Sequence, residues 1–232
     1  MSGRLLKTGV MICILILLVG CAKHISYTQA MRKKIAEFEP IANAQLKPYF
    51  QRTHVKFPPN DIALLIFKRS RRIELYAKQN TPHWVYIRTY PVLAASGGLG
   101  PKLHSGDRQV PEGVYQIVGL NPVSRFDLSM QLNYPNSFDR YYADVDQRAN
   151  LGGNIFIHGN KYSVGCIAIG DVAIQQLFPL VYEVGAHHVK VIIAPNDLRT
   201  HAAAFGRTRP KWLPILYLNL RDELKSFPSP RF

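Results

Sequence analysis

The chain has few cysteines, few acidic residues, no internal repeat and no segment of low complexity. Its 232 residues contain three cysteines, and 15 acidic residues stand against 29 basic ones. A chain of this length is long enough for one domain of ordinary size plus appendages. The hydrophobic content of 47% is normal for a globular core. We therefore expect a single folded domain.

The shortage of acidic residues leaves a formal net charge of +14. Such a balance suits a partner rich in carboxylate or phosphate groups, although a solvated basic surface explains any single Lys or Arg equally well. The export signal described next argues against nucleic acid as a partner. Peptidoglycan, anionic lipid headgroups and wall polymers remain.

The N-terminus has the pattern of a secretory signal. Arg4 and Lys7 form a short basic start, and residues 10–19 are an apolar run that is too short to span a bilayer as a helix. The run ends in Leu18-Val19-Gly20-Cys21, which resembles the lipobox cut by lipoprotein signal peptidase, so Cys21 would become the lipidated first residue. The alternatives are an ordinary signal peptide and an uncleaved anchor. We expect an exported, periplasmic protein that is lipid-anchored to a membrane, the outer rather than the inner.

Cysteine usage singles out one thiol. Cys13 lies inside the signal and Cys21 is the expected lipid site, so the folded domain keeps only Cys166. An oxidising compartment favours disulfides, but this thiol has no partner within the mature chain. Cys166 is therefore either a buried, inert thiol or a reactive one.

A helical segment is expected between the signal and the domain. Apolar residues recur at roughly helical spacing from Ser26 to Tyr49 among charged and amide side chains. The pattern predicts one or two amphipathic helices, which Pro40 should break or kink and Pro58-Pro59 should end. We expect the segment to pack on the domain or to hold it off the membrane.

Short β-prone runs begin at Asp61. We expect strands at 62–67, 73–77, 83–93, 113–120, 154–157 and 189–194, of which the first two form a hairpin. Residues 171–183 have a helical pattern with Asp171 as N-cap, and Pro179 can kink or split this helix. A last short strand or helix is expected after Pro214. The expected fold class is therefore mainly β with short helices, a sandwich or barrel preceded by an N-terminal helical segment.

Residues 155–168 carry the strongest chemical signal. A short apolar strand ends in His158, and Cys166 lies one glycine-containing loop away, just before the expected helix. A thiol near an imidazole and near helix-start N–H groups can hold thiolate character at neutral pH. Backbone N–H groups around Gly165 and Cys166 could face a developing oxyanion. Ser163 either orients one of the two groups or stabilises the loop.

Two other interpretations fit the same residues. Cys166 could be a small core residue and His158 a strand-end histidine with satisfied hydrogen bonds, which is the favoured reading for an isolated pair. A zinc site would need further ligands nearby, and His187-His188 lies too far along the chain. We expect neither a metal nor a cofactor.

Several motifs in the same order resemble the YkuD-type L,D-transpeptidase catalytic-domain family. His158-Gly159 and Ser163-Val164-Gly165-Cys166 are similar to the family's His-Gly and Ser-x-Gly-Cys elements. Further matching stretches lie upstream, namely Gly100-Pro101-Lys102, Gly106-Asp107 and Val110-Pro111-Glu112-Gly113-Val114-Tyr115. The runs 120–124 and 132–136 with Asp139 resemble the YafK-type branch. The resemblance covers about residues 61–195.

The resemblance implies a cysteine acyl-transfer reaction on the stem peptides of peptidoglycan. Cys166 would attack the carbonyl after the L-centre of the diamino-acid residue of a tetrapeptide and form a thioester. His158 would take the thiol proton and later serve the acceptor, while Gly159 would orient the imidazole through its carbonyl. Ser163 and Gly165 would line the substrate and oxyanion site. The acyl group then passes to an amine or to water.

Two departures from the family pattern leave the acceptor open. Val164 and Ala168 replace residues common in relatives, and the gap from His158 to Cys166 is shorter than in the cross-linking enzymes. Both features resemble the YafK-type branch, for which hydrolytic release of wall-linked lipoprotein is a known activity class. A hydrolase that acts on such a lipoprotein or on peptidoglycan is therefore an alternative, and a non-catalytic wall-binding lipoprotein is another.

The expected organisation has four parts. They are a lipoprotein signal peptide (1–20), a helical spacer (21–60), a catalytic domain (61–195) and a C-terminal extension that packs on the domain (196–232).

Overall fold

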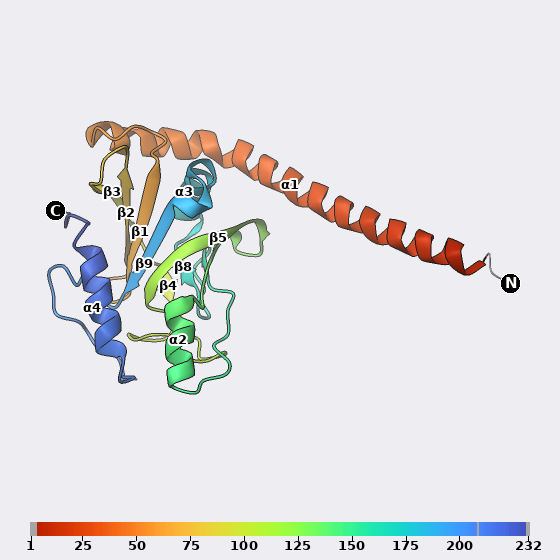
Figure 1. Cartoon of the computed structure of the whole chain (residues 1–232). Helices are drawn as coiled ribbons and strands as arrows, with labels where there is room; N and C mark the ends of the chain where they lie inside the picture. Colours follow the sequence, from red (N-terminus) through yellow and green to blue (C-terminus); the bar gives the residue numbers. More distant parts are fainter. Residues whose placement is uncertain (1–3, 208, 231–232) are drawn as a thin grey trace.

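A nine-stranded sheet organises the protein, whose computed structural model describes residues 4–207 and 209–230 (Figure 1). The strand order is β3-β2-β1-β9-β5-β6-β7-β8-β4. The strands are β1 (Asp61–Phe67), β2 (Arg72–Lys78), β3 (Val85–Pro91), β4 (Ala94–Ala95), β5 (Gly113–Ser124), β6 (Asp127–Leu132), β7 (Phe156–His158), β8 (Ile167–Ala168) and β9 (Val189–Ala194). The helices are α1 (Arg4–Arg52), α2 (Ser137–Val145), α3 (Asp171–Val184), the 3-10 turn η1 (Ala186–His188) and α4 (Leu213–Leu224).

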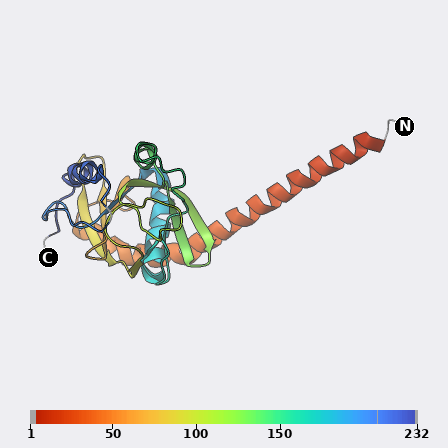
Figure 2. The same ribbon diagram turned by 90° about the horizontal axis from the view of Figure 1, so that it is seen from below.

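The sheet curves into a half-barrel, and Figure 2 shows the strands bending around the interior. This confirms the expected fold class of a mainly β protein with short helices and an N-terminal helical segment. The predicted runs at 62–67, 73–77 and 189–194 correspond to β1, β2 and β9, and the predicted hairpin is the antiparallel pair β1–β2. The strands β4, β6 and β8 and the helix α2 were not predicted.

Strand β1 explains why the sheet has a core on both faces. Six of its seven residues are buried, and alternate side chains enter different clusters. Leu64 belongs to the core under α1 and α3, whereas Leu65 belongs to the core under α4. A continuous apolar run is the pattern expected of a strand covered on both sides. The neighbours are β2, which is antiparallel, and β9, which is parallel.

Helix α1 is a single continuous helix of 49 residues, so of the two expected effects of Pro40, a break or a kink, the break does not occur. Both Pro40 and Pro48 lie inside it. The helix continues because its second half packs on the domain and buries Leu46 and Phe50, and this burial offsets the lost backbone hydrogen bond. Its N-terminal half projects away from the sheet (Figure 1). Within residues 4–207 and 209–230, no helix combines the length and the apolar character needed to cross a membrane.

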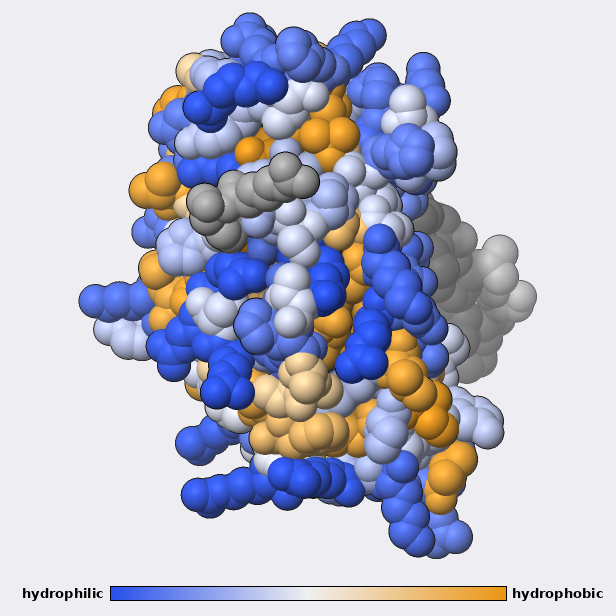
Figure 3. All heavy atoms as spheres, turned by 90° about the vertical axis from the view of Figure 1, so that its left-hand side faces the viewer, coloured by the Kyte–Doolittle hydropathy of each residue, from blue (hydrophilic) through white to orange (hydrophobic). Residues whose placement is uncertain are grey.

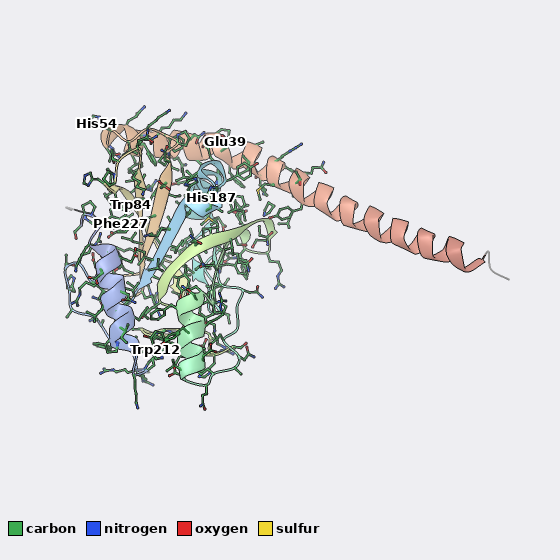
Figure 4. The ribbon with its side chains drawn as sticks, in the orientation of Figure 1. Glu39, His54, Trp84, His187, Trp212 and Phe227 are labelled. Carbon is green, nitrogen blue, oxygen red and sulfur yellow. The ribbon has the colours of Figure 1, made fainter. Side chains whose placement is uncertain are left out.

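The C-terminal extension forms α4, so the expected last element is a helix rather than a strand. It covers the face of the sheet opposite α3, and Trp212 joins it to α2 (Figure 4). The Trp212 ring stacks on Tyr142 at 4.9 Å, and its Nε1–H donates to Asp146 Oδ2 at 2.8 Å. Figure 3 shows that the side carrying α4 presents mainly hydrophilic side chains with small apolar patches between them.

Helix α3 follows the predicted range, but its start is different. The N-cap is Gly170, with φ of 81°, and Asp171 is the first helical residue rather than the cap. The Asp171 carboxylate instead accepts the Asn160 N–H at 2.6 Å and so holds the loop after β7. Pro179 lies within the helix without splitting it.

Candidate active site

The pairing of two short strands brings the predicted histidine and cysteine to one place. Strands β7 and β8 are parallel, with Ile157 opposite Ile167 and His158 opposite Ala168. Cys166 directly precedes β8, so it lies next to the β7 backbone, two positions along the strand from His158. The loop that joins the two strands is the predicted nucleophile loop, residues 159–166.

His158 is held at one edge and covered on one face. Its side chain is buried, and Nδ1 lies 2.6 Å from the carbonyl oxygen of Gly159. A donor to that carbonyl must be Nδ1–H, which leaves Nε2 as the basic nitrogen of the neutral ring. Burial lowers the pKa of His158, and the Gly159 carbonyl opposes this effect. The imidazole is therefore neutral at pH 7 and able to accept a proton.

Cys166 is half-buried, and its thiol differs from the sequence expectation. Its Sγ lies 3.7 Å from the Asn154 carbonyl oxygen, to which it can donate. Burial raises the pKa of the Cys166 thiol, although the Phe156 N–H and the Lys102 charge act in the opposite direction. The direction of this shift is opposite to the lowered thiol pKa that thiolate character at neutral pH requires. One reason is that the strand β8 separates Cys166 from α3, whose first N–H groups begin only at Asp171.

The nucleophile loop is held by Ser96, a residue that the sequence analysis missed. The Ser96 hydroxyl accepts the Gly165 N–H at 2.5 Å and donates to the Arg108 carbonyl at 2.7 Å. The Ser96 N–H donates to Ser163 Oγ at 3.1 Å, and Ser163 Oγ–H donates to the Cys166 carbonyl at 2.6 Å. Of the two readings of Ser163, its contacts therefore favour stabilisation of the loop.

The two glycines of the site, Gly159 and Gly165, allow backbone arrangements that a side chain would not permit. Gly165 has φ of 90°, a conformation that L side chains rarely adopt, and its N–H is bound by Ser96. This contradicts the expectation that the Gly165 N–H faces an oxyanion. At Gly159, a Cβ would lie 2.6 Å from both Asp171 Oδ1 and the Phe126 carbonyl oxygen, so no other residue fits there without movement.

The upstream motif residues form a buried polar scaffold beside this loop. Lys102 Nζ lies 2.5 Å from Asp107 Oδ1 and donates to the His104 carbonyl at 2.7 Å. Glu112 accepts the Gly100 N–H at 2.7 Å through Oε1 and the Tyr217 O–H at 2.9 Å through Oε2. The second contact links the scaffold to α4.

Two further groups act at the site: Phe126 was not named by the sequence analysis, and Lys102 was named only as a motif residue. Phe126, in the turn between β5 and β6, packs against His158, and Lys102 contributes charge near Cys166. A single aromatic residue in the polar turn Ser124-Arg125-Phe126-Asp127 was the only available signal for the first. In residues 4–207 and 209–230, no cluster of three or more His, Cys, Asp or Glu side chains could hold a metal ion.

Comparison with known proteins identifies the family. A family model of the YkuD L,D-transpeptidase catalytic domain matches residues 61–193. A protein of Escherichia coli strain K12 with the name "Putative L,D-transpeptidase YafK" is 33% identical over 122 residues. That alignment covers 52% of this chain and 47% of YafK, so the chain spans about half the length of the curated relative that it matches.

Solved structures show weaker likeness. The helical cell shape determining protein Pgp2 of Campylobacter jejuni is 20% identical with a TM-score of 0.48, over 73% of this chain and 56% of Pgp2. Bd1075 of Bdellovibrio bacteriovorus is 18% identical with a TM-score of 0.44, over 71% and 54%. L,D-transpeptidase 1 of Mycobacterium tuberculosis is 10% identical with a TM-score of 0.33, over 57% and 61%.

The half-barrel sheet defines a β-rich protein. Its short strands β7 and β8 bring together a thiol and an imidazole, Cys166 and His158. The family model matches more than half of the chain, and the chain therefore belongs to the YkuD-type family of L,D-transpeptidase catalytic domains. This confirms the family resemblance seen in the motifs.

Proposed function

We propose that the protein is a peptidoglycan-modifying cysteine acyl-transferase that forms a thioester on Cys166. The observation that supports this most directly is the pairing of β7 with β8, which brings the backbone of the half-buried Cys166 within two strand positions of the buried His158. Membership of the L,D-transpeptidase family makes stem peptides the substrate class that fits this pair.

The chemistry begins from a neutral pair rather than an ion pair. His158 Nε2 takes the Cys166 proton as Sγ attacks the carbonyl carbon after the L-centre of the diamino-acid residue. The C–N bond to the terminal D-amino acid then breaks, and the imidazolium returns the proton to the leaving amine. The products of this half-reaction are the thioester on Cys166 and a free D-amino acid. Gly159 supports the step because its carbonyl fixes the His158 tautomer.

The acceptor defines the second half-reaction. An amine from another stem peptide would give a cross-link, and water would give hydrolysis; in both cases His158 removes a proton from the incoming group. The short spacing from His158 to Cys166 and Val164 in the loop resemble the YafK-type branch and keep the hydrolytic alternative open, including release of a wall-linked lipoprotein. The same thioester serves both outcomes, so its formation and its fate are tested separately.

We further propose that the protein acts outside the cytoplasm, held at a membrane by lipid on Cys21. The basic start, the apolar run at 10–19 and the lipobox-like ending support this location. Two or more acyl chains suffice for stable membrane attachment. Replacing Cys21 with Ser should release the protein from the membrane fraction or stop signal processing. Wild-type protein without acyl groups by intact-mass analysis would contradict the anchor.

Defined muropeptides test the reaction. Full-length protein in detergent is incubated with disaccharide-tetrapeptide, with and without an amine acceptor, and the products are identified by mass spectrometry. We expect loss of the terminal D-amino acid, with either a cross-linked dimer or a tripeptide as the second product. The matched control is Cys166→Ser. Absence of any product that depends on Cys166 would contradict the proposed enzyme and favour a wall-binding role.

A further inference from the structure

Phe126 covers one face of the His158 ring. The two ring centroids lie 4.5 Å apart, and the ring planes are tilted by 30°. Phe126 is 37% exposed and His158 only 2%, so the phenyl ring stands between the imidazole and solvent. The two residues are 32 positions apart in sequence and belong to neighbouring parts of the sheet, the β5–β6 turn and the end of β7.

The turn that carries Phe126 is fixed by its own hydrogen bonds and by α3. The Phe126 N–H donates to Ser124 Oγ at 3.1 Å, which closes the turn. Asp127, with φ of 68°, accepts from Gln175 Nε2 at 2.8 Å, which ties the turn to α3. Because this turn is fixed, the Phe126 side chain can restrict the orientation of the His158 ring.

The same turn also packs closely on the backbone after His158. The Gly159 N–H donates to the Leu128 carbonyl at 3.2 Å, and a Cβ at Gly159 would meet the Phe126 carbonyl oxygen at 2.6 Å. The N-terminal helix reaches this hairpin too, because the Tyr27 hydroxyl donates to a β5 carbonyl, that of Leu120. The hairpin that carries Phe126 is therefore held by the backbone after His158 and by α1, and these contacts keep Phe126 over the imidazole.

We propose that Phe126 is a positioning residue for His158: it fixes the plane of the imidazole and excludes water from one face of it. The inference rests on the proposed roles of His158 and Cys166 and adds a residue that acts through the base. A single hydrogen bond at Nδ1 fixes the edge of a planar ring but leaves it free to tilt, and an aromatic ring packed against its face removes that freedom. Nε2 is thereby kept at one place for the Cys166 proton.

The apolar cover also agrees with the charge state of the imidazole. Burial is the main cause that lowers the pKa of His158, and Phe126 is the aromatic side chain that provides cover at the outer face. The titratable residues on the β5–β6 turn, the loop 159–166 and the first turn of α3 are Arg125, Asp127, Lys161, Tyr162, Cys166 and Asp171. The two carboxylates among them bind Gln175 and the Asn160 N–H respectively, so neither replaces the apolar contact.

The test compares Phe126→Ala with Phe126→Leu, and uses Val123→Ala as the matched control on the same hairpin. Val123 is 66% exposed and its loss removes apolar surface elsewhere on the hairpin. Two readouts on the full chain are independent of peptidoglycan: NMR titration of the His158 ring, and the pH dependence of Cys166 alkylation by iodoacetamide. They remain valid even if the muropeptide reaction fails, so a failure of this inference is distinguishable from a failure of the proposed enzyme.

Phe126→Ala should raise the pKa of His158 toward its ordinary value and move the acid limb of the alkylation profile to higher pH. A shift of one unit corresponds to about tenfold slower alkylation below that limb. Phe126→Leu should keep the limb near its wild-type position because it still excludes water, and Val123→Ala should change nothing. If Phe126→Ala does not fold, Phe126→Ser is used as the second variant that admits water. An unchanged titration and an unchanged limb in a folded variant, or a rate reduced equally at every pH, would overturn the proposal.

Discussion

The two ends of the sheet differ in the length of their strands and in how the strands are held. On one side of β5, the strands β1, β2 and β9 have six or seven residues and are buried along most of their length. On the other side, β7, β8 and β4 have three, two and two residues, and serine hydroxyl groups hold the loops between them. The long strands supply most of the apolar core, and the short ones, which add Ile157 and Ile167 to it, carry His158 and lead away from Cys166. Most of the buried apolar area therefore lies at one end of the sheet, and the candidate catalytic pair lies at the other.

The largest expected effect falls on the short-strand end and on activity alone. Cys166→Ala should reduce turnover by about 10³-fold or more, because the proposed nucleophile is lost. The melting temperature should stay close to wild type, since Cys166 is half-buried in a loop and its thiol interacts with backbone groups, the Asn154 carbonyl at 3.7 Å and the Phe156 N–H. Muropeptide turnover and thermal unfolding are measured on the same preparation. A Cys166→Ala variant that kept its activity but lost stability would show that Cys166 supports the fold rather than the reaction.

The opposite result is expected at the long-strand end. Leu64→Ala in β1 should lower the free energy of unfolding by about 2–5 kcal/mol, because Leu64 is fully buried between β2 and β9 and its loss leaves a cavity. Below the new melting temperature, kcat should change little. Urea unfolding gives the first quantity. A large fall in kcat of the folded variant would show that the two ends are coupled.

Ser96 orders the nucleophile loop, so its replacement should affect both stability and catalysis. Ser96→Ala removes the acceptor of the Gly165 N–H, which should cost about 1–2 kcal/mol of stability and reduce kcat/KM by about 10- to 100-fold. Ser96→Thr keeps the hydroxyl and is the matched control. The measurement is kcat/KM with stability determined in parallel. Equal behaviour of the two variants would contradict the assigned role of the hydroxyl.

The smallest expected effect is on how the rate of Cys166 alkylation depends on pH. Since burial lowers the pKa of His158 and raises that of the Cys166 thiol, alkylation of the wild type should rise first below the ordinary pKa of histidine and again above that of cysteine. The first rise requires a neutral imidazole as base, so His158→Gln should abolish it and leave the second. A single rise that is unaffected by His158→Gln would contradict the neutral pair.

The same group links pH to stability. His158 has a lower pKa when folded than when unfolded, so the unfolded chain binds its proton more readily. The free energy of unfolding should therefore fall as the pH drops below the ordinary histidine value. His158→Gln should remove this part of the pH dependence, as measured by urea unfolding at several pH values. An equal loss in wild type and variant would assign it to other groups.

The sequence predicts the long-strand end well for a physical reason. The apolar runs of β1, β2 and β9 are long enough to show a pattern, and burial on both faces keeps that pattern continuous. Strands of two residues such as β4 and β8 have no period that could be detected. Helix α2 was missed although Asn136 and Asp139 form a capping box at its start, which is a readable signal.

The motif residues of the site were predictable, but their state was not. The spacing of His158-Gly159 and Ser163 to Cys166 pointed to the right loop, and the structure places these residues together. The raised pKa of the Cys166 thiol, the Gly165 N–H bound by Ser96 and the Phe126 cover all depend on contacts between distant segments. Such contacts arise only when the half-barrel closes around the site.

The most direct test of the account is capture of the acyl-enzyme. Full-length protein is mixed rapidly with disaccharide-tetrapeptide, quenched in acid, and examined by intact-mass and peptide mass spectrometry. We predict a mass increase equal to the substrate acyl group without its terminal D-amino acid, mapped to Cys166, removed by hydroxylamine and absent in Cys166→Ser. Turnover of the substrate without any adduct on Cys166, or an adduct on another residue, would contradict the thioester mechanism.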